Sequence, residues 1–109
     1  MTRLELIQII GDVISQIDVA RGSLLPDDPN RHRLDDLRVL LDDRQRKLSQ
    51  STFDDSTPEF QQAAAKLKTV DTEIRGSIQQ VNNIAAVLGN INKFLGAATS
   101  LITTIGPFV

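Results

Sequence analysis

The sequence predicts an all-α protein, a helical bundle or coiled coil of three helices with a long C-terminal helix, and three observations support this class. Apolar residues recur at steps of three and four along most of the chain, as on one side of an α-helix. The four prolines lie between or beyond these repeating stretches. No stretch convincingly resembles a strand. At 109 residues, positions 1–109 are expected to form a single helical domain.

An N-terminal helix is expected over residues 2–25. Thr2 and Glu5 have the spacing of a capping box, in which the two side chains satisfy free backbone donors at the helix start. Pro26 and Pro29 end this helix, because proline donates no backbone hydrogen bond and restricts the residue before it. The apolar stripe consists of Leu6, Ile10, Val13, Ile17, Ala20 and Leu24.

A second helix is expected over residues 30–51, with a narrow stripe of leucines and Arg44 at the remaining position of the stripe. Its other faces carry arginines interleaved with pairs of aspartates, a pattern typical of a solvated surface with ion pairs. Residues 1–56 are therefore predicted to form a charged helical hairpin. The leucines of the stripe are Leu34, Leu37, Leu41 and Leu48.

A third helix is expected to begin within one residue of Thr57. Its cap is either Ser56, which has capping-box spacing to Glu59, or Thr57, with Pro58 then at the first helical position. Its apolar seam continues without loss of phase, which predicts one long helix over residues 57–109. The Gly89-Asn90 pair favours an alternative with four helices and a break near Gly89. The seam positions are Phe60, Ala63, Leu67, Val70, Ile74, Ser77, Val81, Ile84, Leu88, Ile91, Leu95, Ala98, Ile102 and Ile105.

Charge is unevenly distributed along this chain. Residues 1–75 carry 25 of the 26 charged residues, whereas residues 76–109 carry only Lys93. A helix that is apolar on most of its faces is usually buried. The first two helices, other copies of the chain or a membrane could cover it.

The C-terminal helix is therefore the predicted interaction surface. Its isoleucines and leucines would form a hydrophobic seam, its glycines would let another backbone approach closely, and its phenylalanines would be peripheral anchors. The predicted residues are Ile84, Leu88, Gly89, Ile91, Phe94, Leu95, Gly96, Ile102, Ile105 and Phe108.

We expect a non-enzymatic interaction protein that forms a homo-oligomer or binds a protein partner through this helix. An alternative is a membrane-active protein, pore-forming or delivery-associated, whose C-terminal helix is sheltered in the soluble state. Membrane insertion is not favoured, because a gain of about −4.5 kcal/mol from the apolar residues is offset by about +3 kcal/mol for Lys93 and by the neighbouring asparagines. A third alternative is an immunity- or chaperone-like partner of a toxin or effector.

Composition argues against other classes of function. The chain has no cysteine and one histidine, His32, so no catalytic, metal or cofactor site is expected. No glycine-rich phosphate loop is present. The net charge is −2 and the basic residues alternate with aspartates, which does not suit nucleic acid.

The N-terminal residues bear on localisation. Acidic residues at 5, 12 and 18 interrupt any apolar run that could act as a cleavable signal peptide. The sequence therefore predicts a protein that is cytoplasmic as synthesised, and signal-less export or conditional membrane association stays open.

Overall fold

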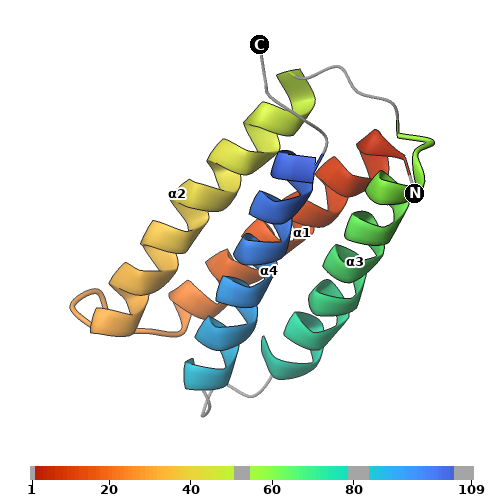
Figure 1. The fold of residues 1–109 in the computed structure, drawn as a ribbon. Coiled ribbons are helices and arrows are strands. Elements are labelled where there is room, and N and C mark those ends of the chain that lie inside the picture. Colours follow the sequence, from red (N-terminus) through yellow and green to blue (C-terminus); the bar gives the residue numbers. More distant parts are fainter. Residues whose placement is uncertain (1, 51–54, 79–83, 105–109) are drawn as a thin grey trace.

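The computed structural model describes residues 2–50, 55–78 and 84–104, which form four α-helices. These are α1 (Arg3–Gly22), α2 (Pro29–Gln50), α3 (Pro58–Ile78) and α4 (Ile84–Thr104). Figure 1 shows α1 and α2 as one hairpin and α3 and α4 as a second. The all-helical prediction is therefore confirmed for the described residues.

The helix starts follow from local capping. Thr2 Oγ1 accepts a hydrogen bond from the backbone N–H of Glu5 at 3.2 Å, so Thr2 is the cap of α1. Thr57 Oγ1 likewise accepts from the N–H of Phe60 at 3.2 Å, and Pro58 occupies the first position of α3. These contacts satisfy donors that the first turn of a helix leaves free.

Within each hairpin the two helices run antiparallel. Gln45 Nε2, late in α2, donates to the backbone carbonyl of Ile7, early in α1, at 3.0 Å. Lys93 Nζ, in α4, donates to Glu73 Oε2, late in α3, at 3.2 Å. The chain therefore reverses direction between α1 and α2 and again between α3 and α4.

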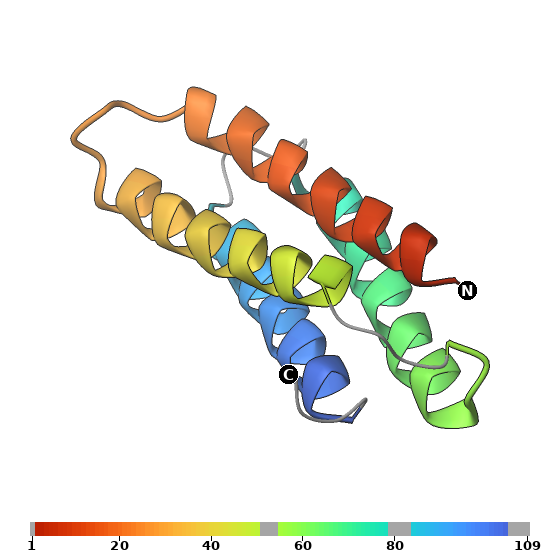
Figure 2. The same cartoon turned by 90° about the horizontal axis from the view of Figure 1, so that it is seen from above.

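The two hairpins stack as layers, with α3 beneath α1 and α4 beneath α2 (Figure 2). The stacked helices run parallel. The N–H of Arg3 donates to Asp55 Oδ2 at 3.1 Å, so α1 and α3 begin at the same end of the bundle. Arg44 Nε donates to Thr99 Oγ1 at 3.2 Å and joins α2 to α4.

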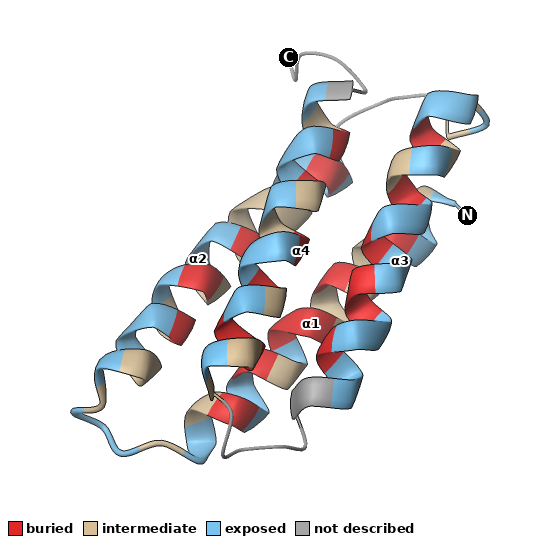
Figure 3. Ribbon diagram, turned by 60° about the horizontal axis from the view of Figure 1, so that its bottom comes forward, coloured by how far each residue is buried: buried red, intermediate tan, exposed pale blue. Residues whose placement is uncertain are grey.

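The buried residues of all four helices form one hydrophobic cluster between the layers, coloured red in Figure 3. The predicted stripe of α1 is confirmed from Leu6 to Ala20, and the four leucines of α2 are buried as expected. The cluster consists of Leu6, Ile10, Val13, Ile14, Ile17, Ala20, Leu34, Leu37, Leu41, Leu48, Phe60, Ala64, Leu67, Val70, Ile74, Val87, Leu88, Ile91, Phe94, Ala98 and Leu101.

The prediction of one long helix over residues 57–109 is wrong. Such a helix would be about 80 Å long, whereas the longest dimension of the molecule is 42 Å. Helix α3 ends at Ile78 and the chain has reversed direction when α4 begins at Ile84. The four-helix alternative has the right number among the described residues but places the break wrongly, because Gly89 lies inside α4.

Candidate interaction surface

The chain's own core takes up most of the apolar residues predicted to bind a partner. Leu88, Ile91 and Phe94 are buried. Phe94 was expected to be a peripheral anchor, yet its side chain is 0 % exposed. The reason is that α4 contacts both α2 and α3, so its buried side is wider than the predicted seam and includes Phe94 and Leu101.

The other predicted residues fall into three groups. Partly buried against the core are Ile84, Leu95 and Ile102. Gly89 and Gly96 are exposed, and Ile105 and Phe108 lie outside the described residues. Among the predicted residues that the structure describes, the two glycines are exposed, and the residues of the hydrophobic seam are buried or half-buried.

A different side of α4 faces outwards, and we name it the α4 outer face. Its residues follow one another at helical steps of three and four, all are exposed, and none is charged. From its first to its last residue this face extends about 27 Å along the helix. It consists of Ala85, Gly89, Asn92, Gly96, Ser100 and Thr103.

Polar side chains beside this face point to neighbouring helices. Lys93, the one charged residue of α4, is paired with Glu73 on α3. Thr99 accepts the hydrogen bond from Arg44 on α2. The charge of Lys93 is therefore partly compensated at the edge, and the α4 outer face itself is neutral.

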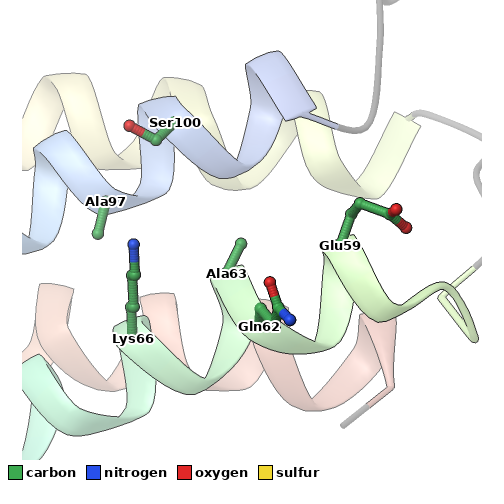
Figure 4. A pocket seen from close by; sticks show the side chains of 6 residues that line it. All are labelled: Glu59, Gln62, Ala63, Lys66, Ala97 and Ser100. Atoms are coloured by element: carbon green, nitrogen blue, oxygen red, sulfur yellow. The ribbon is translucent and has the colours of Figure 1, made fainter.

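A groove of about 370 Å³ runs along the α3 side of this face (Figure 4). Ala63 and Ala97 are short side chains on α3 and α4, and Figure 4 shows Lys66 reaching from α3 towards Ala97. Glu59 lies towards the start of α3. The groove therefore has small apolar residues with one charge of each sign beside them, and Ser100 joins it to the α4 outer face.

A second feature, which the sequence did not predict, lies between α1 and α3. Asp12 and Gln16 of α1 meet Asp71 and Arg75 of α3, and we name these four residues the α1–α3 polar cluster. Gln16 Nε2 donates to Asp12 Oδ2 at 2.9 Å and to Asp71 Oδ1 at 3.1 Å. Arg75 donates to Asp12 and pairs through Nε with Asp71 Oδ2 at 3.4 Å.

Burial raises the pKa of the Asp71 carboxyl above its ordinary value, and the nearby Asp12 carboxylate raises it further. Arg75 and Gln16 act in the opposite direction but do not cancel this effect. The hydrogen bond to Asp12 in turn raises the pKa of the Arg75 guanidinium. Asp12, Asp71 and Arg75 of this cluster line a groove of about 490 Å³, which Glu5 and Lys68 also line.

Within residues 2–50, 55–78 and 84–104, no three histidine, cysteine or acidic side chains gather where they could hold a metal ion. None of the four helices over these residues is both long and apolar enough to cross a membrane.

Comparison with known proteins does not assign this arrangement to a family. No protein-family model matches the chain, and no curated protein or solved structure matches it either.

Proposed function

We propose that this chain is a non-enzymatic helical interaction protein that self-associates by packing the α4 outer face against the same face of a second copy. The observation that carries the proposal is the contrast between this face and the rest of the surface. The α4 outer face is exposed and neutral, whereas the outer sides of α1 and α2 carry ion pairs such as Arg38–Asp18 and Arg46–Asp42.

The two glycines of this face support a close helix–helix contact. A glycine inside a helix destabilises it by about 0.5–1 kcal/mol relative to alanine. At Gly11 the fold itself favours glycine, because a Cβ at this position would lie 3.1 Å from Gln45 Nε2. At Gly89 and Gly96 a Cβ would meet nothing within 4 Å.

The bundle therefore does not require glycine at these two positions. A partner that approaches α4 from outside would explain why glycines are present there. Helix axes can approach to about 8 Å when the residues between them are small. Gly89 and Gly96 lie seven residues apart, two turns along the same side of α4, where a second helix could contact both.

The proposal is tested by the oligomeric state of Gly96→Arg, measured by light scattering over a range of protein concentrations. The wild-type protein is expected to self-associate and the variant to remain a monomer, because arginine holds the facing helix away. Gly76→Arg is the matched control. It adds the same side chain to an exposed position of α3 where a Cβ also meets nothing within 4 Å.

Both variants are expected to stay folded, since replacing an exposed helical glycine raises helix propensity by several tenths of a kcal/mol. A wild-type protein that is monomeric at every concentration would contradict self-association, as would equal effects of the two substitutions. Cosedimentation of the wild-type monomer with liposomes would instead favour the membrane-active alternative.

A further inference from the structure

The α1–α3 polar cluster contains more hydrogen-bond acceptors than donors. Its two carboxylates are linked by the amide nitrogen of Gln16 and by the guanidinium of Arg75. Gln16 Oε1 is buried and has no hydrogen-bond partner among the described residues. A proton bound within the cluster would supply one more donor where acceptors are in excess.

The negative charge of the cluster is also buried more deeply than the positive charge. The side chain of Asp71 is 8 % exposed, whereas that of Arg75 is 60 % exposed. Water screens the guanidinium and weakens its attraction for the buried carboxylate. Two carboxylates against one guanidinium leave a net charge of −1 at neutral pH.

The surrounding charges do not change this balance. Glu5 of α1 and Lys68 of α3 line the same groove and offset each other. Helix α4, which packs on another side of α3, carries only Lys93, and this lysine is paired with Glu73. A proton taken up by Asp71 would therefore neutralise the buried carboxylate and remove the net negative charge of the cluster.

We propose that the α1–α3 polar cluster is a proton-dependent clamp, which takes up one proton as the pH falls and then holds α1 and α3 together more firmly. The contact joins helices from different hairpins, so it acts between the two layers of the bundle. The clamp is independent of the self-association proposed for the α4 outer face.

The direction of the effect follows from the raised pKa of Asp71. Between the ordinary value of 3.8 and the higher value in the folded protein, the folded state holds a proton that the unfolded state releases. The unfolding free energy therefore rises as pH falls through this interval and decreases as pH rises through it. Across the whole interval, the unfolding constant changes by the ratio of the two acid dissociation constants.

Urea unfolding of the wild-type protein and of Asp71→Asn between pH 4.5 and 8 tests the clamp. Asparagine keeps the size of the side chain and removes the charge. At pH 8 the wild type is expected to unfold at a lower urea concentration than Asp71→Asn. The difference between their two urea midpoints is expected to narrow as pH falls. Asp36→Asn, a change at an exposed position of α2, is the matched control. The difference between its urea midpoint and that of the wild type should stay the same across this pH range.

A second measurement does not depend on a folded variant. The side-chain carboxyl ¹³C resonance of Asp71 in the wild-type protein should titrate with a midpoint above the ordinary range of aspartate. A gap between wild type and Asp71→Asn that does not change with pH would overturn the clamp. So would a carboxyl midpoint at or below the ordinary value.

Discussion

Replacing Phe94 by alanine is expected to destabilise the protein by about 3–5 kcal/mol. Phe94 is among the largest fully buried side chains and belongs to the core cluster between the layers. The loss combines the transfer of an aromatic ring out of the core with the cavity that remains. Domains of this size are stable by about 5–15 kcal/mol, so Phe94→Ala removes a large part of the total.

Urea unfolding followed by circular dichroism at 222 nm measures this loss. The matched control is Val39→Ala on α2, whose side chain is 68 % exposed and which should change the free energy by less than about 0.5 kcal/mol. If Phe94→Ala is as stable as Val39→Ala, Phe94 lies outside the core and the orientation of α4 described above is wrong.

A charge at Ile91 is expected to have a larger effect still and to leave the chain unfolded at neutral pH. Ile91 is 0 % exposed, and an aspartate there would be a buried charge without a partner. Asn92→Asp is a close control, because it adds the same charge to the same helix at the next, exposed position. This control should retain the helical circular dichroism spectrum of the wild type.

The same pair of variants separates two explanations of the apolar stripe on α4. If Ile91 faced a second copy rather than its own core, Ile91→Asp would yield a folded monomer. A folded, monomeric Ile91→Asp protein would therefore contradict the burial of this residue within one chain.

The first two helices could be predicted closely because their signals are local. The cap at Thr2 and the prolines at 26 and 29 mark the ends of helices, and these signals do not depend on the rest of the fold. The expected bounds 2–25 and 30–51 differ from those of α1 and α2 by three residues or fewer. The predicted stripes are buried because the apolar side of an amphipathic helix packs against the hydrophobic core.

The reversal between α3 and α4 could not be read from periodicity alone. The apolar seam keeps its phase from Ile74 to Ile84, so the steps of three and four continue although the helix does not. One signal was present, because Ser77 is the single polar position of the seam and α3 ends at the next residue. The alternative with four helices places the break near Gly89, but a glycine alone does not end a helix, and Gly89 lies inside α4.

The polar cluster could not be predicted for a different reason. It depends on α1 and α3 running side by side in the same direction, although α2 separates them in the sequence. Asp12 and Asp71 each look like ordinary surface carboxylates within their own helices. Only the stacking of the two hairpins brings them to one amide and one guanidinium.

All that is proposed for α4 requires this helix to fold back along α3, and a cysteine cross-link measures that directly. The chain has no cysteine of its own, and Glu73 and Lys93 form an ion pair at 3.2 Å. The double variant Glu73→Cys, Lys93→Cys is treated with a short bifunctional maleimide at low protein concentration. The control pair, Glu73→Cys with Thr103→Cys, places the second cysteine about 15 Å farther along α4.

With α4 folded back along α3, the first pair is expected to form a cross-link within one chain. The product has the mass of a monomer, and its digest contains a cross-linked peptide. Little reaction is expected between the two cysteines of the control pair. In an unbroken helix residues 73 and 93 would lie about 30 Å apart. Absence of the internal cross-link, or cross-links only between chains, would contradict the fold-back of α4.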